Sequence, residues 1–183
     1  MRRALVVDTE TTGLVPNATI KNDWLPEIVE VYAALVDFDA DGGSTIVDEL
    51  DQLVRPSRPI VEASRSGMTH GITNEMVRDA PAFRAVLPRL RKMIESAPVV
   101  VAHNATFDRE VIDIEARRAG GAIVWPPLLC TIEQSIGLRG HRMSLGDLHE
   151  ELTGMRFEGA HRAKVDVAAL IRCIGELVRR EML

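Results

Sequence analysis

The run Ala4–Asp8, ALVVD, restricts the possible fold more than any other part of the chain, because it is apolar up to its last residue. Such a continuous apolar run is typical of a central β-strand that is covered on both faces. It ends at Asp8, and Glu10 follows two positions later. Residues i and i+2 of a strand share a face, so we expect the two carboxylates to converge where the strand ends.

Two carboxylates on one face of a strand repel each other unless a cation lies between them. Oxygen atoms are the ligands that magnesium and manganese prefer, so Asp8 and Glu10 predict a divalent-metal site. The alternative is a solvated turn, because an acidic chain produces Asp-x-Glu readily by chance. Taken alone, the pair favours this alternative.

The rest of the chain predicts an α/β fold, with a mixed sheet and helices on its faces. The expected further strands carry apolar runs or alternation and are residues 27–38, 46–56, 98–104 and 123–131. The expected helices show 3.6-residue periodicity and are residues 81–96, 106–121 and 162–180. We expect a turn at 39–43, a capping box from Ser144 to Asp147, and a bend or break at Pro88.

Length and composition limit the class of protein. The 183 residues suit one domain, residues 1–183, and the net charge of -5 argues against a general nucleic-acid coat protein. It does not exclude a metal-dependent nuclease, because metal ligands are themselves acids. Cys130 and Cys173 lie far apart and are expected to be buried thiols. No apolar stretch approaches the ~20 residues of a membrane span, so we expect a cytoplasmic protein without a membrane partner.

A second polar group follows another apolar run, in VAHNATFDREVI. His103 and Asn104 form a polar turn, and Phe107 and Asp108 lie near the start of the next helix. The ordinary explanations are a core role for Phe107 and compensation of the helix dipole by Asp108, worth less than ~1 kcal/mol. The functional interpretation is that Asp108 faces the first acidic pair while Phe107 supplies an apolar platform for a base or sugar.

A third group lies in GAHRAKVDVAAL. His161 and Asp166 are five positions apart, which is not a same-face helical spacing. We therefore place His161 on a loop and Asp166 in the first turns of the last helix. A structural histidine and an ordinary early-helix aspartate are the alternatives, so each group is weak evidence by itself.

The three groups occur together and in order, and DTETTGL, AHNATFD and HRAKVD resemble the three motifs of the DEDDh, or DnaQ-like, 3′-to-5′ exonuclease family. EIVEVYAALV and HGITNEMV are also similar to this family's second strand and to its HGIT element. The resemblance implies a ribonuclease H-like, mixed five-stranded sheet flanked by helices. The chain departs from the commoner pattern in its longer Val15–Pro26 loop and in Tyr32, where many members have a small residue.

The resemblance also implies roles for individual residues. Asp8, Glu10, Asp108 and Asp166 would hold two Mg²⁺ or Mn²⁺ ions per active site, and His161 would take the proton from the attacking water. The residues implied in substrate binding contact the terminal nucleotides or the backbone, and they are Thr11, Leu14, His103, Asn104 and Phe107. Core packing is the alternative for Leu14 and Phe107.

The leading functional hypothesis is an exonuclease that acts on the 3′ end of DNA, single-stranded or frayed, in proofreading or repair. An exoribonuclease that trims RNA ends is the first alternative, because no motif reports a contact with the 2′-hydroxyl. An end-binding module or polymerase subunit with little activity is the second. Nucleic acid is the expected partner, with a polymerase or a second copy of the chain as possible protein partners.

Basic residues gather in sequence around the third motif. We expect them to contact phosphates with a marked salt dependence, and a solvated surface is the equally weighted alternative. They are Arg139, His141, Arg142, Arg156, Arg162 and Lys164.

Overall fold

The computed structural model describes residues 2–16 and 25–183, and its centre is a five-stranded sheet with the strand order β3-β2-β1-β4-β5. The strands are β1 (Arg3–Thr11), β2 (Ile28–Phe38), β3 (Ser44–Leu53), β4 (Val100–Ala102) and β5 (Leu128–Cys130). The first three strands are antiparallel, whereas β1 pairs in parallel with β4, and β4 with β5. The predicted mixed sheet is therefore confirmed, and β1 is its central strand.

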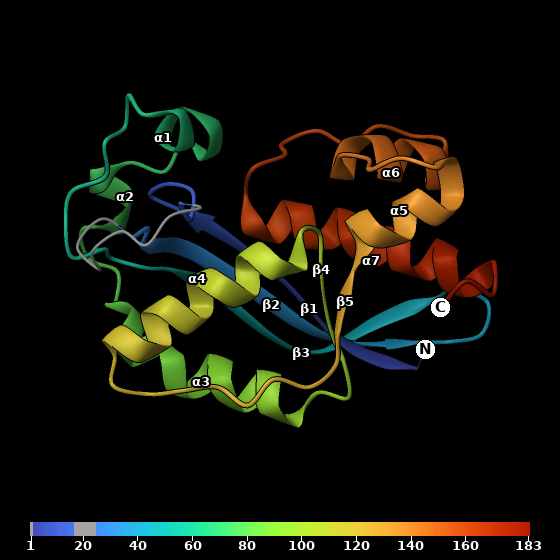
Figure 1. Ribbon diagram of the computed structural model, residues 1–183, viewed down its shortest axis with the longest axis horizontal. Coiled ribbons are helices and arrows are strands. Elements are labelled where there is room, and N and C mark those ends of the chain that lie inside the picture. Colours follow the sequence, from blue (N-terminus) through green and yellow to red (C-terminus); the bar gives the residue numbers. More distant parts are fainter. Residues whose placement is uncertain (1, 17–24) are drawn as a thin grey trace.

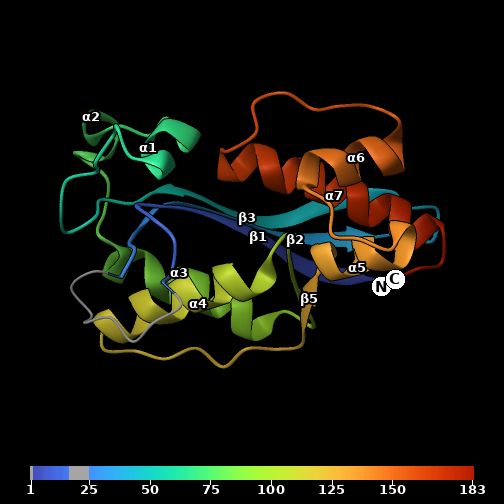
Figure 2. The same cartoon turned by 45° about the horizontal axis from the view of Figure 1, so that its top comes forward.

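Helices cover both faces of this sheet (Figures 1 and 2). They are α1 (Arg65–His70), α2 (Asn74–Val77), α3 (Phe83–Ser96), α4 (Ala105–Arg118), α5 (Thr131–Arg139), α6 (Leu145–Thr153) and α7 (Ala163–Arg179). Figure 2 shows α3 and α4 on one side of the sheet and α6 and α7 on the other. The helices predicted at 81–96, 106–121 and 162–180 correspond to α3, α4 and α7.

Successive side chains of β1 point to opposite faces of the sheet, so the hydrophobic core has two layers. Leu5 and Val7 pack in the cluster beneath α3 and α4, whereas Ala4 and Val6 pack in the cluster beneath α6 and α7. All four are at most 1% exposed. The continuous apolar run at the start of the chain thus has the predicted cause, because β1 is buried on both faces.

The expectation that Pro88 splits its helix is wrong, because α3 continues through it. A proline in a helix interior costs about 3 kcal/mol. Fully burying one large apolar side chain contributes about 1.5–3 kcal/mol. Six residues of α3 are buried, so their combined contribution exceeds the cost. They are Phe83, Val86, Leu87, Leu90, Met93 and Ile94.

Other elements of secondary structure also differ from those that the sequence predicts. The strand expected at 123–131 is only the three residues of β5. The helices α1, α2 and α5 were not predicted, since α1 and α2 are too short for a periodic signal and α5 has little apolar asymmetry. The turn at 39–43 and the Ser144–Asp147 capping bond are confirmed.

Most of the Val15–Pro26 loop, whose role the sequence left open, lies outside the described residues. The thiols of Cys130 and Cys173 are free. Among the described residues, no helix is both long and apolar enough to cross a membrane.

Candidate active site

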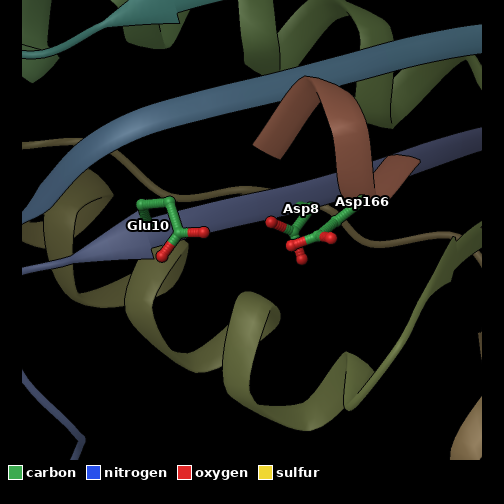
Figure 3. A group of neighbouring side chains, drawn as sticks. All are labelled: Asp8, Glu10 and Asp166. Carbon is green, nitrogen blue, oxygen red and sulfur yellow. The ribbon is translucent and has the colours of Figure 1, made fainter. Parts of the chain in front are cut away.

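Three carboxylates meet where β1 ends (Figure 3). Asp8 and Glu10 project from the same face of β1, and Asp166 projects toward them from the first turn of α7. One oxygen from each lies within 4.8 Å of the others. The i, i+2 spacing in the strand and the early-helix position of Asp166 therefore produce the predicted convergence.

Burial raises the pKa of each acid in this cluster, and the charges of nearby carboxylates add to the rise. Burial is the largest cause for Asp8, whose pKa is well above its usual range, and the charges of Asp108 and Glu10 add to it. The pKa of Glu10 rises to about 8, through burial and then the charges of Asp166 and Glu30. Burial likewise raises the pKa of Asp166. These acids resist being charged together, which is the condition that a divalent cation relieves.

The hydrogen bonds of Asp166 leave room for such a cation. Its Oδ2 accepts a hydrogen bond of 2.9 Å from the backbone N–H of His161. Its Oδ1 is buried and has no hydrogen-bond partner among the residues the structure describes. A buried carboxylate oxygen without a donor is costly, so this atom fits the role of a metal ligand.

Asp108 lies in the first turn of α4 and is 3% exposed. It is outside the group of oxygens within 4.8 Å, and its Oδ1 accepts a hydrogen bond of 2.8 Å from the Thr9 hydroxyl. Burial raises the pKa of Asp108 to about 7. Its charge still acts on Asp8 and Glu10. The structure thus brings Asp108 to the edge of the cluster, tied to the strand residue between the paired acids.

His161 lies on the loop before α7, as its spacing from Asp166 predicts. Its backbone is left-handed, with φ of 70°, and its side chain is exposed. It lines a cavity of about 410 Å³ together with Glu10. The other lining residues come from β1, α1 and α4 or the loop after β1, and they are Thr9, Thr11, Leu14, Arg65, Ser66, Thr69, His70 and Phe107. The carboxylate of Glu10, the imidazole of His161 and an apolar wall therefore share one cavity.

A model of the RNase_T family, described as exonuclease, matches residues 5–174. The chain belongs to the exonuclease family that this model describes. Its sheet and helices have the ribonuclease H-like arrangement found in the solved structure of a DEDDh family member.

Individual relatives agree with this assignment. The 3′-5′ exonuclease DinG of Bacillus subtilis is 30% identical over 169 residues, which are 90% of this chain and 16% of that protein. A DNA polymerase III subunit epsilon-like protein of Rhodobacter capsulatus is 43% identical over 108 residues, 59% of this chain and 14% of that protein. The chain thus spans less than a fifth of the length of these curated relatives.

A solved structure is similar over nearly the whole chain. The structure of exonuclease X in complex with 5′ overhanging duplex DNA has a TM-score of 0.64 and 28% sequence identity. The match covers 95% of this chain and 90% of that one.

The residues expected in substrate binding fall into two sets. Thr11, Leu14 and Phe107 line the cavity, and Leu14 is 74% exposed. His103 and Asn104 are not among its lining residues. His103 instead contacts Thr131, with 3.0 Å between Nδ1 and the hydroxyl oxygen, and burial lowers its pKa to about 4. Asn104 is exposed in the left-handed conformation that begins α4, with φ of 79°.

The sequence pattern did not indicate that the residues of α1 form part of the cavity wall. Arg65, Ser66, Thr69 and His70 belong to α1, whose first residue follows a cap formed by the Ser64 hydroxyl. The HGIT element was noticed, but nothing in its local pattern indicates that it faces acids some sixty positions earlier. Arg65 is exposed and has no ion pair among the described residues.

Arg162, which was expected to contact phosphate, is held in an ion pair with Glu30. Its Nη2 lies 2.6 Å from Oε1 of Glu30, whose side chain is only 4% exposed. The Nε of Arg162 and the backbone N–H of Ala163 also donate to Glu30. Arg162 therefore attaches the start of α7 to β2, although its side chain is still 41% exposed.

Most of the other basic residues near the third motif are also in ion pairs. Lys164 pairs with Asp51, Arg139 with Glu151 and Arg156 with Glu150. His141 and Arg142 are exposed, without an ion pair in the described part of the chain. These pairs are at the surface and weak, but they leave this cluster less charge to offer than the sequence indicates.

Proposed function

We propose that this chain, as one domain of residues 1–183, removes nucleoside monophosphates from the 3′ end of DNA with the aid of divalent cations. The observation that carries the proposal is the meeting of three carboxylate oxygens within 4.8 Å, beside a cavity that also includes His161 and the exposed Leu14. A single-stranded or frayed end is the expected substrate, because the cavity is bounded by side chains that would flank an unpaired base.

The roles of the residues follow from their positions. Asp8, Glu10 and Asp166 are the ligands for Mg²⁺ or Mn²⁺, and Asp108 supplies a further carboxylate beside them. Two such ions, when bound, make water a stronger nucleophile and offset charge on the leaving 3′ oxygen. His161 accepts the proton of the attacking water, a task that suits imidazole near neutral pH.

The other cavity residues hold the terminal nucleotide. Leu14 and Phe107 flank its base, and backbone groups around Thr11 hold the 3′-hydroxyl. Apolar and aromatic contacts tolerate every base, so little sequence preference is expected. Arg65 adds a cation to the wall on the α1 side, where it can contact a phosphate.

The names of the relatives support DNA over RNA. One relative is named as a polymerase III epsilon-like subunit, and exonuclease X was solved with duplex DNA. A polymerase is accordingly the protein partner that these relatives support.

The first test is a time course of hydrolysis with 5′-labelled single-stranded DNA and RNA of matched sequence, in Mg²⁺, Mn²⁺ or EDTA. We expect a descending ladder that requires metal and is faster on DNA. Asp166→Asn should slow it by at least ~10²-fold, because it removes a charged ligand. Asp41→Asn makes the same change in an exposed turn and should have no effect.

Three outcomes would contradict the proposal. A ladder that survives in EDTA or in Asp166→Asn would exclude the metal site. Immediate release of the labelled 5′ nucleotide would exclude the 3′-to-5′ direction. A faster ladder on RNA would replace DNA by RNA as the substrate.

A further inference from the structure

The active-site cavity is followed by neighbouring cavities that share lining residues with one another. Leu14 also lines a second cavity of about 290 Å³, whose wall includes Arg58 and Glu27. That cavity shares Glu27 with a third of about 510 Å³, and it shares Arg58 with a fourth of about 270 Å³. The third and fourth both run along residues 55–57. We call these three connected cavities the arginine groove.

The segments whose residues line the arginine groove lie at the same end of the molecule as α1 and α2 (Figures 1 and 2). Its walls are the segment after β3, the start of α3 and the end of α4. Both figures show these segments gathered at that end. Substrate bound in the active-site cavity can therefore reach the groove by passing Leu14.

The groove presents positive charge that the fold does not neutralise. Arg55 and Arg84 line it, are exposed and have no carboxylate partner among the described residues. Nη1 of Arg55 donates to the carbonyl oxygen of Arg78 at 3.2 Å, which orients its guanidinium. Arg78, in contrast, is paired with Glu75.

The two acids in the groove are already engaged. Glu27 is 7% exposed and accepts hydrogen bonds from the backbone N–H and the hydroxyl of Ser57, while Arg58 lies 3.6 Å away. Glu115 is also 7% exposed and is paired with Arg118. The outward-facing charge of the groove is thus positive, unlike the largely paired cluster around the third motif.

We propose that the arginine groove binds the phosphodiester backbone of the nucleic acid beyond the nucleotide held in the active-site cavity. The proposal rests on the exonuclease function proposed above. Phe83, the aromatic residue in the wall, is 4% exposed and so offers no face for stacking. The groove therefore contacts phosphates rather than bases, which makes binding independent of sequence and dependent on salt.

Two sources can supply this backbone. It is either the earlier part of the strand being degraded or the complementary strand of a duplex end, which Leu14 would separate from the strand in the active site. Both place phosphates on the same arginines, and substrates of different length and strandedness distinguish them.

The test compares Arg55→Ala/Arg84→Ala with Lys92→Ala/Arg117→Ala. The control removes the same charge from exposed positions that are outside the groove and have no ion pair in the described chain. The substrates are single strands of about 4 and about 20 nucleotides and a duplex with a 5′ overhang, at ~50 to ~200 mM salt. The value measured is kcat/KM.

The groove variant should lose about 10-fold or more in kcat/KM at low salt, and its salt slope should fall by ~1.4 to ~1.8, the value for two phosphate contacts. A loss on the longer single strand but not the short one identifies the degraded strand as the ligand. A loss confined to the duplex identifies the complementary strand. Equal values for the groove variant and the control on all three substrates would overturn the proposal.

A binding measurement separates failure of the groove from failure of the enzyme. Fluorescence anisotropy of the same labelled substrates in EDTA reports affinity without hydrolysis. Arg84→Glu, a change at a side chain with no bond among the described residues, should weaken binding more than Lys92→Glu. Equal affinities would refute the groove even if the wild type proved inactive, whereas an inactive wild type with the expected affinity loss would refute only the exonuclease function.

Discussion

At the scale of single residues, the acid cluster is a source of instability in the metal-free protein. Burial raises the pKa of Asp8, Glu10 and Asp108 above their usual ranges, and for Asp8 and Glu10 the neighbouring carboxylates add to the rise. The folded state thus binds protons more tightly than the unfolded state, and stability falls as pH rises through the interval between the two pKa values. For Glu10 that interval runs from its ordinary 4.5 to about 8.

Glu10→Gln should therefore stabilise the metal-free protein at pH ~8, where the wild-type carboxylate is deprotonated at a cost, and leave it unchanged at pH ~4. An increase in the free energy of unfolding on the order of 2 kcal/mol corresponds to a Tm that is higher by about 4–8 °C. Thermal unfolding in EDTA at both pH values measures it. Glu158→Gln, at an exposed position, is the control. A pH-independent difference between Glu10→Gln and wild type would mean that burial of this carboxylate is not the cause.

At the scale of elements, the start of α7 decides the geometry of the site, since it carries Asp166 and follows His161. Its attachment to β2 is the pair between Arg162 and the buried Glu30. Removing one partner of such a pair leaves an uncompensated buried charge. This pair engages the basic residue next to His161, which the sequence indicated as a phosphate contact.

Arg162→Met should lower the free energy of unfolding by about 2–4 kcal/mol and reduce kcat/KM as well, while leaving the salt slope of activity unchanged. Lys164→Met, two positions later, breaks an exposed pair with Asp51 and should lower stability by less than ~1 kcal/mol. Urea unfolding and activity at two salt concentrations measure both variants. Should Arg162→Met instead keep full stability and flatten the salt slope, Arg162 would be a phosphate contact after all.

At the scale of the whole molecule, the turn between β2 and β3 lies directly against α7. A Cβ atom added at Gly175 would be 2.4 Å from the backbone oxygen of Gly42, and one added at Gly42 would be 2.4 Å from the oxygen of Gly175. Neither backbone can yield locally, because one belongs to the last helix and the other to a hairpin turn with φ of 83°. This close contact fixes the position of the hairpin turn against α7.

Gly175→Ala should therefore destabilise the fold by about 1–3 kcal/mol, although alanine ordinarily favours a helix. Gly137→Ala, within α5 and with nothing near its added Cβ, should instead stabilise by about 0.5–1 kcal/mol. Chemical unfolding of both variants measures the sign of each change in the free energy of unfolding. The same sign in both would show that the hairpin and α7 are not in close contact in solution.

The local sequence pattern was sufficient to predict the strands and helices with strong hydrophobic periodicity. It was also sufficient to predict where the acidic residues lie on them. The apolar run that ends at Asp8, the i, i+2 spacing to Glu10 and the early-helix position of Asp166 are all local, and the structure confirms each. These features depend on strand and helix geometry, which acts over a few residues.

Only the tertiary structure decided which charged and polar groups find partners. Arg162 and Glu30 are 132 positions apart, and Thr9 and Asp108 are 99 apart, so no local pattern could pair them. The short helix α1 likewise joins the cavity through chain folding rather than through periodicity. The phosphate contacts that we propose therefore lie at Arg55 and Arg84 rather than in the basic run around the third motif, because ion pairing depends on distance in space and not on spacing in sequence.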